Sequence, residues 1–314
     1  MYDILIKNAK IADGTGNPTF FADVAVKNGK IARVCKNLKA EAETVIDGKG
    51  KVLSPGFIDA HSHGDSIFGT EAGRLCKVSQ GITTEIAGQC GTTFWPISED
   101  PEKQDLMLQR QGKMPDGWQN FTSMQNYLAW TAQQPLSCNF MLYMGHSALR
   151  IAVMGYDDRR PMAEELDHMK ALLREAMEHG AVGLSSGLIY APGCFAKTDE
   201  LIEIAKVAGE YQGIAAIHLR SESTELVKAV GEFITIVRQS GVRGVVSHHK
   251  AAGLSENWGK VHTTLRMIDQ ANAEGLDVYA DVYPYNAYNT SLLPIFGTIE
   301  FRANSREVML EELK

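Results

Sequence analysis

Residues 53–65 have the sequence Leu-Ser-Pro-Gly-Phe-Ile-Asp-Ala-His-Ser-His-Gly-Asp, and this stretch decides the predicted fold. An apolar run that follows Pro-Gly and ends in His-x-His is typical of a buried strand with two imidazoles at its C-terminal end. Since strand side chains alternate faces, His61 and His63 point the same way, close enough to bind one divalent metal. Taken alone, the pattern also suits a strand with two ordinary histidines, one of them hydrogen-bonded in a core.

Downstream of this stretch, strand-like apolar runs alternate with segments of helical period. Seven runs begin near Phe57, Gly81, Cys138, Ala181, Gly213, Val242 and Leu276. The segment after Pro161 shows the helical pattern, because one face carries Leu166, Met169, Leu172, Leu173, Ala176 and Met177. A second helix, with Thr198 as its N-cap, has apolar residues at the same spacing. Continuously apolar strands that alternate with helices predict a parallel sheet covered by helices.

The polar residues that follow the strands favour a barrel over an open sheet. Each run ends with His, Cys, Ser, Tyr or Asp, and chemistry at the C-terminal ends of many strands is typical of the (β/α)8 barrel. A dinucleotide-binding sheet needs a Gly-rich turn after its first strand, and the sequence has none there. We predict an α/β TIM-type barrel with seven of its eight strands, and a helix that begins near Arg306. The sequence is therefore expected to be the N-terminal part of a longer polypeptide.

Residues 1–52 alternate short β-rich runs with turn-forming residues. Residues 13–18 and 28–30 contain Asp-Gly and Asn-Gly at hairpin spacing, which predicts a small antiparallel unit. We expect residues 1–52 to belong to one domain and residues 53–314 to the barrel domain, incomplete at its C-terminus.

The composition excludes several classes of protein. A length of 314 residues with 44% hydrophobic content suits a large globular core, and a net charge of −7 without basic clusters argues against nucleic acid or a membrane as partner. No stretch approaches the roughly 18 apolar residues of a membrane span. The first seven residues lack a signal-peptide core, so we expect a cytoplasmic protein. Five widely spaced cysteines do not predict a disulfide framework.

Imidazole and thiol groups stand at the ends of four predicted strands. They are His61, His63, Cys90, His218 and His248. In a barrel these ends meet at one mouth, although the residues are far apart in sequence. Imidazole and thiolate ligands suit zinc better than magnesium or calcium, which prefer oxygen. The sequence therefore predicts a zinc site.

Several further motifs carry a family resemblance. They are Asp13-Gly14-Thr15-Gly16, Pro55 to His63, Gly88-Gln89-Cys90-Gly91, Gly183 to Gly193, Ile217 to Glu222, Ser247-His248-His249-Lys250 and Asp281-Val282-Tyr283-Pro284-Tyr285. With these motifs the chain resembles the amidohydrolase superfamily and, within it, the N-acyl-D-amino-acid deacylases, also called D-aminoacylases. The resemblance extends over essentially the whole chain. It implies a metal-dependent hydrolase barrel, with residues 1–52 as part of a small N-terminal β-sandwich domain.

The resemblance also implies how metal is bound. Many superfamily relatives bridge two metals with a carboxylated lysine from the fourth strand, but that strand ends here in Ser185-Ser186. Cys90 thus resembles the bridging or principal thiolate of the D-aminoacylases. The implied arrangement is one zinc on Cys90, His218 and His248, and a second, weaker site that uses His61 and His63.

The implied reaction is zinc-dependent hydrolysis of the amide bond of N-acyl-D-amino acids, giving a carboxylate and a free D-amino acid. A metal-activated water attacks the amide carbonyl. The family's general base is an Asp after the eighth strand, which lies beyond Lys314. Asp281 and Asp65 are the nearest carboxylates, and neither is assigned that role. His249 faces away from His248 on a strand and is expected to pack or to support a ligand.

Four residues resemble groups that contact the substrate. Tyr190 and Tyr283 are the tyrosines, and Lys250 and Arg220 are the cations expected near the substrate carboxylate. The alternative is that the tyrosines pack the barrel rim and the cations are solvated or paired. The family often has a Ser where this chain has Asn289, so that contact stays open. The segment 94–121 is long for a connection and suits either a lid or additional core.

Two other functions stay open. A cyclic-amide hydrolase, such as a dihydroorotase or hydantoinase, is disfavoured because the fourth-strand lysine is missing. A non-catalytic scaffold is disfavoured because all five metal ligands are retained, although the isolated 314-residue chain is expected to be poorly stable and inactive.

Overall fold

The computed structural model describes residues 1–67, 70–290 and 311, and of Arg74 only the backbone. The chain divides into two compact units, Met1–Phe57 and Ile58–Lys314. The predicted helix near Arg306 lies, except for Glu311, outside the described residues. Within those residues, no helix is both long and apolar enough to cross a membrane.

The N-terminal unit is a five-stranded sheet with the order β3-β2-β1-β4, in which β5 also pairs with β1. Its strands are β1 (Tyr2–Ile11), β2 (Phe20–Lys27), β3 (Lys30–Cys35), β4 (Ala42–Asp47) and β5 (Val52–Leu53). The two predicted hairpins are present, because β1–β2 and β2–β3 are antiparallel. The prediction of a purely antiparallel unit is wrong, since β4 and β5 both run parallel to β1. The chain crosses over after β3 and adds these strands to the far side of β1.

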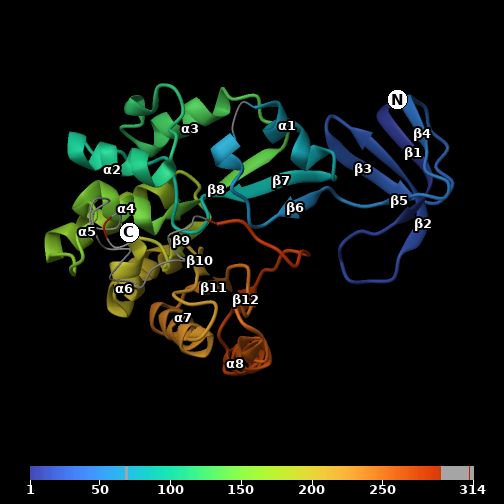
Figure 1. Ribbon diagram of the computed structural model, residues 1–314. Coiled ribbons are helices and arrows are strands. Elements are labelled where there is room, and N and C mark those ends of the chain that lie inside the picture. Colours follow the sequence, from blue (N-terminus) through green and yellow to red (C-terminus); the bar gives the residue numbers. More distant parts are fainter. Residues whose placement is uncertain (68–69, 291–310, 312–314) are drawn as a thin grey trace. The chain divides into compact units, whose positions relative to one another are not determined.

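The second unit is built on a seven-stranded sheet with the order β12-β11-β10-β9-β8-β7-β6. Its strands are β6 (Phe57–Asp59), β7 (Ile82–Ala87), β8 (Asn139–Gly145), β9 (Gly183–Gly187), β10 (Ile214–His218), β11 (Arg243–Val246) and β12 (Val278–Ala280). Each neighbouring pair from β7 to β12 is parallel. The seven predicted strands are confirmed, with starts within two residues of those expected. The sheet is curled, and the strands follow one another in sequence order (Figure 1).

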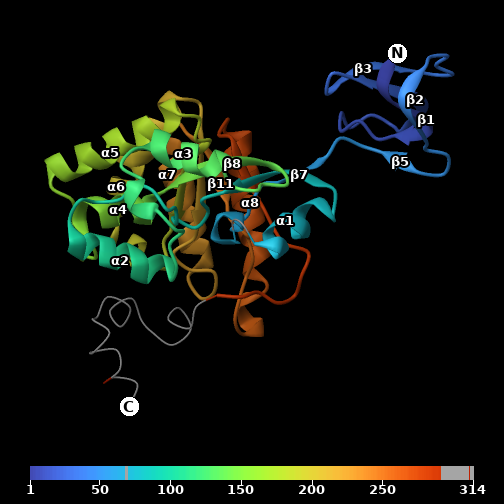
Figure 2. The same ribbon diagram turned by 90° about the horizontal axis from the view of Figure 1, so that it is seen from above.

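Helices connect these strands and cover the sheet. They are α1 (Glu71–Val78), α2 (Pro101–Gln111), α3 (Met124–Ala132), α4 (His146–Met154), α5 (Ala163–Glu178), α6 (Thr198–Glu210), α7 (Leu226–Ser240) and α8 (Lys260–Ala273). Short 3-10 helices are η1 (Gly64–Ile67), η2 (Trp118–Asn120), η3 (Gly193–Phe195) and η4 (Ser255–Asn257). Each helix from α4 to α8 packs against the next, and Figures 1 and 2 show them on the outside of the sheet.

The helical faces predicted from the sequence form the core. On α5 the residues Met169, Leu173, Ala176 and Met177 are buried, and they belong to one large cluster with the strand residues Met144 and Ile217. The predicted N-cap of α6 is wrong by one residue. Thr198 is the first helical residue, and its hydroxyl donates to Glu232 Oε1 at 2.9 Å instead of capping the helix.

The segment 94–121 contributes to the core, and its residue Arg110 also reaches the ring of Tyr190, with Cζ 5.1 Å from the ring centre. It contains α2 and η2, and its apolar residues Phe94, Trp95, Met107, Met114 and Phe121 are all buried in the main cluster. Burial of such large side chains stabilises by about 1.5–3 kcal/mol each relative to exposure. The structure therefore confirms additional core for these apolar residues, and a lid stays a prediction.

A buried ion cluster joins α4 to α6 beneath the sheet. The guanidinium of Arg150 donates to both carboxylate oxygens of Glu200, at 2.8 and 2.6 Å, and to the carbonyls of Asp157 and Arg159. His146 Nε2 lies 3.0 Å from the same carboxylate. Burial would raise the pKa of Glu200, but the hydrogen bond from His146 and the charge of Arg150 hold it below its usual value. Each group depends on the others, because an unpaired buried charge is costly.

We expect Glu200→Ala to lower the free energy of unfolding by about 3–5 kcal/mol, since it leaves the Arg150 guanidinium buried without its carboxylate. Urea denaturation followed by circular dichroism measures the change. Asp199→Ala is the matched control, because this neighbouring carboxylate is exposed and pairs with exposed Arg160; its loss is expected to cost about 1 kcal/mol or less. Equal costs for the two variants would contradict the prediction.

Candidate metal centre

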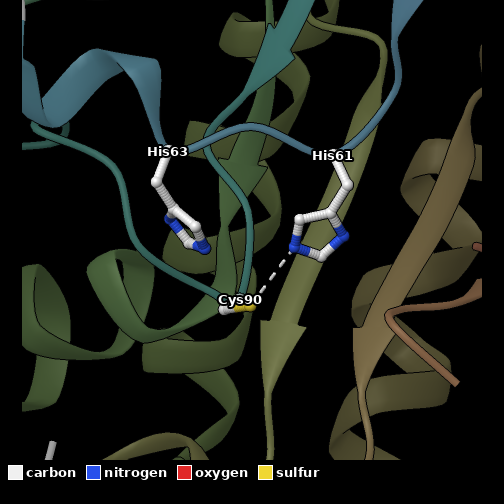
Figure 3. Close-up of side chains that lie close together, drawn as sticks. All are labelled: His61, His63 and Cys90. Carbon is white, nitrogen blue, oxygen red and sulfur yellow. Dashed lines mark hydrogen bonds between the residues drawn. The ribbon is translucent and has the colours of Figure 1, made fainter. Parts of the chain in front are cut away.

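The five predicted ligands lie together at one end of the parallel sheet. His61 and His63 follow β6, Cys90 follows β7, His218 ends β10, and His248 follows β11. Because all these strands run in the same direction, their C-terminal ends meet at one edge, and side chains separated by up to 187 positions become neighbours. Figure 3 shows His61 and His63 on the same side of their turn, with both rings toward Cys90.

The donor atoms form two groups that share the sulfur. One group is His61, His63 and Cys90, and the other is Cys90, His218 and His248, with the ligand atoms of each group within 4.8 Å of one another. Cys90 Sγ lies 3.7 Å from His61 Nε2 and 3.5 Å from His248 Nε2. Tetrahedral zinc, with Zn–S of about 2.3 Å and Zn–N of about 2.0 Å, places such ligand atoms roughly 3.5 Å apart. These two sulfur–nitrogen distances are therefore close to those that tetrahedral zinc sets.

The backbone that carries Cys90 is packed tightly. Cys90 itself has φ of 54°, in the left-handed region that non-glycine residues rarely adopt. A Cβ at Gly187 on β9 would lie 2.2 Å from the carbonyl oxygen of Cys90, so only glycine lets β9 approach this loop. Ser185 hydrogen-bonds to the loop as well, because its hydroxyl accepts from Gly91 N and donates to the carbonyl of Gly88. The end of β9 thus supports the loop that carries Cys90, and it has no lysine that could bridge two metals.

Three of these groups favour their neutral forms when no metal is bound. Burial raises the pKa of the Cys90 thiol to about 12. Desolvation at the site, with the neighbouring His61 and His248, lowers the pKa of His63 to about 4, although His63 retains exposed surface. Burial also holds the pKa of His218 well below its usual value. His218 Nδ1 is buried and has no hydrogen-bond partner among the described residues. Neutral imidazoles and a buried thiol that a cation would ionise form a donor set that fits zinc.

Sequence reasoning assigned no role to Glu222, which contacts two of the candidate ligands. Its carboxylate lies 2.8 Å from His248 Nδ1, 2.6 Å from Lys250 Nζ and 3.9 Å from His218 Nε2. Burial would raise the pKa of Glu222, but the hydrogen bond from His248 and the nearby charges lower it to about 2. With Nδ1 protonated toward Glu222, His248 presents Nε2 to the sulfur. The sequence signal that could have identified Glu222 is its position four residues after His218, the histidine at the end of β10.

Asp281 orients His61, which follows the edge strand β6. Its Oδ2 lies 3.1 Å from His61 Nδ1, and its Oδ1 accepts from the backbone N–H of His248. Asp281 follows β12 and His61 follows β6, so this carboxylate links the two edge strands of the sheet across the site. In the described structure Asp281 is a hydrogen-bond partner of ligands, and His249, which faces the other way, bonds to Thr264 at 2.8 Å.

A cavity of about 460 Å³ opens beside the ligands. Tyr190, Lys250 and Tyr283 line it with Asn289, so three of the four predicted substrate-contacting residues lie at the site. The hydroxyl of Tyr283 is buried and without a hydrogen-bond partner in the described part of the chain, while that of Tyr190 lies 2.9 Å from Thr290 Oγ1. The volume suits a small molecule.

Two predicted candidates lie outside this cavity. Arg220 is bound to Glu232 through two hydrogen bonds of 3.0 and 2.9 Å and to the carbonyls of Cys194 and Ala196, and it lines a second cavity. Asp65 is buried, and burial raises its pKa to about 7. The structure therefore does not bring either residue to the ligand groups. No disulfide joins the five cysteines, all of which lie in the described part of the chain.

The sequence matches the family model described as "Amidohydrolase family" over residues 44–309. The chain belongs to the amidohydrolase family. It is 37% identical to an N-acyl-D-glutamate deacylase and 36% identical to a D-aminoacylase, both from Alcaligenes xylosoxydans xylosoxydans, over 93% of this chain and 59% of each relative.

Solved amidohydrolase structures show the same relationship. N-acyl-D-glutamate deacylase from Bordetella bronchiseptica, complexed with zinc and a phosphonate inhibitor that mimics the tetrahedral intermediate, superimposes with a TM-score of 0.82 at 37% identity, over 90% of this chain and 59% of that chain. L-hydantoinase from Arthrobacter aurescens reaches a TM-score of 0.60 at 21% identity, which is a likeness of fold alone. The chain thus spans about three fifths of the length of these relatives.

We expect Glu222→Ala to weaken zinc binding about 10- to 100-fold, because His248 loses the partner that fixes its orientation. Titration of the metal-free protein against a competing chromophoric chelator measures the change. Glu225→Ala is the control, since this exposed glutamate lies three residues further along, and its carboxylate lies 4.0 Å from the ammonium of exposed Lys228. An unchanged zinc affinity in Glu222→Ala would rule out the orienting role.

Proposed function

We propose that this chain carries the metal centre of a zinc-dependent hydrolase that cleaves the amide bond of N-acyl-D-amino acids, giving a carboxylate and a free D-amino acid. The observation that carries the proposal is the Cys90 sulfur shared by two histidine groups, with Ser185 where a bridging lysine would stand on β9. The relatives named N-acyl-D-glutamate deacylase and D-aminoacylase support it.

The described residues provide ligands for two zinc positions in such a site. Cys90, His218 and His248 would hold one zinc ion, and His61 and His63 with the shared sulfur would hold a second. When bound, zinc lowers the pKa of its water to about 7 and polarises the amide carbonyl. No general base is assigned within the described residues.

The cavity offers groups for the rest of the substrate. Lys250 Nζ lies 5.6 Å from the ring centre of Tyr283 and 5.4 Å from that of Tyr288, and its charge is offset by Glu222. A substrate carboxylate near Lys250 and Tyr283 would find one ammonium and one hydroxyl that has no partner among the described residues. This arrangement supports a small-molecule substrate with a carboxylate that competes with Glu222 for Lys250. A contact of Arg220 with the substrate stays a proposal, since Glu232 holds this residue at the second cavity.

The wider architecture belongs to the same proposal. We infer that the seven parallel strands are part of a (β/α)8 barrel, and that the five-stranded N-terminal sheet, residues 1–52 with the linker that follows, is part of a β-sandwich. A cytoplasmic location and the absence of nucleic-acid partners stay predictions from the sequence.

We expect the purified protein to contain one or two zinc ions per chain, and Cys90→Ala to lose nearly all of it, because the sulfur belongs to both ligand groups. Elemental mass spectrometry gives the metal content. Cys194→Ala removes another buried cysteine, one that lines the separate second cavity, and should keep its zinc. Full zinc occupancy in Cys90→Ala would contradict the proposed centre.

We expect the native gene product, loaded with zinc, to hydrolyse N-acetyl-D-methionine at least ~100-fold faster than its L-enantiomer, since the enantiomer cannot place both its carboxylate and its amide on the same groups. Release of the free amino acid, followed with a ninhydrin-type amine reagent, measures the rates. A hydantoin serves as the competing substrate. Turnover of the hydantoin alone would favour the cyclic-amide alternative, and no turnover despite bound zinc would favour a scaffold.

A further inference from the structure

A single buried carboxylate holds the turn between the two histidines that follow β6. The hydroxyl of Ser62 donates to Glu85 Oε2 at 2.7 Å and accepts from the backbone N–H of Gly64 at 2.9 Å. Ser62 is 3% exposed and Glu85 is 5% exposed, so water does not compete for these bonds. The link therefore runs from a strand side chain, through one hydroxyl, to the backbone immediately after His63.

The turn is shaped around this carboxylate. A Cβ added to Gly64 would lie 2.1 Å from Glu85 Oε2 and 2.7 Å from its Cδ, and the three nearest atoms all belong to Glu85. Gly64 therefore lacks a side chain where the carboxylate packs directly against the turn. The other polar neighbours of Glu85 are more distant, with Lys77 Nζ at 3.7 Å and Cys138 Sγ at 3.8 Å.

The same segment also supports the turn from its other side. Ser62 N donates to the carbonyl of Ile86 at 3.0 Å, and Gln89 Nε2 donates to the carbonyl of Ala60 at 3.0 Å. Glu85, Ile86 and Gln89 lie on β7 or directly after it, and the next residue is Cys90. The segment that presents the sulfur thus also fixes the backbone that presents the two imidazoles.

We propose that Glu85 is a positioning residue for the metal position formed by His61 and His63. Through Ser62 it sets the register of the histidine turn against the Cys90 loop, so that both rings face the sulfur, as in Figure 3. The inference rests on the proposed two-ion centre. His218 and His248 come from other strands and do not use this link, so the effect of Glu85 falls on one of the two metal positions.

The test is a zinc titration of the metal-free chain against a competing chelator, with apo-protein melting followed in parallel. A His61→Ala variant identifies which zinc equivalent belongs to His61 and His63. In Glu85→Ala, that equivalent is expected to bind about 10- to 100-fold more weakly, while the other keeps its affinity. Glu85→Gln, which retains a side-chain oxygen for Ser62, should recover most of the loss. Cys138→Ala is the matched control, because it removes another neighbour of Glu85 without touching the turn.

Gly64→Ala gives an independent measurement. Its methyl group displaces the carboxylate, so the variant should weaken the same equivalent; in the Glu85→Ala background the methyl group has room, and the double variant should bind no worse than Glu85→Ala. Glu85→Ala could instead weaken both zinc equivalents by the same factor and lower the melting temperature of the apo-protein. That result would mean that Glu85 only maintains the fold, and it would overturn the inference. If Glu85→Ala leaves the affinity of the zinc equivalent of His61 and His63 unchanged, the positioning role of Glu85 is overturned, and the two-ion centre is not. A wild-type chain without a second equivalent would overturn the two-ion centre and this inference with it.

Discussion

The candidate metal centre depends on one constraint, the common direction of the strands from β7 to β12. Parallel strands end at the same edge of a sheet, so each strand needs to supply only one or two side chains there. The sheet is bounded by β6 and β12, and the hydrogen bond between His61 and Asp281 joins residues that directly follow these two edges. The sheet brings the groups near one another, and the hydrogen bonds at its edge set their orientation.

Orientation of the ligands carries a conformational cost that the surrounding packing offsets. Cys90 and His248 have φ of 54° and 37°, values that cost non-glycine residues of order 1–3 kcal/mol each. Gly187 lets β9 approach the loop that carries Cys90, and Gly64 lets the Glu85 side chain pack against the turn that follows β6. The large core formed by α4 to α8 makes such local strain tolerable, since the buried apolar surface is extensive.

Two buried carboxylates in the second unit each form an ion pair with a cation. Glu222 offsets Lys250 beside the ligands, and Glu200 offsets Arg150 on the helical side of the sheet. Such pairs add little net stability compared with apolar packing, yet the loss of one partner is costly, so they fix geometry more than they stabilise the fold. At the metal centre this geometry decides which imidazole nitrogen faces the sulfur.

The sequence by itself determined the seven strands, the helical faces and the five candidate ligands, because hydrophobic period and strand-end residues are local signals. It could not determine that β4 and β5 run parallel to β1, that residues 94–121 pack into the core, or that Arg220 is bound to Glu232, since each depends on a partner distant along the chain. The contacts of Glu222, Asp281 and Glu85 could not be predicted for the same reason. A carboxylate has no periodic signature, and only the tertiary structure decided that these three contact the histidines or the turn that carries them.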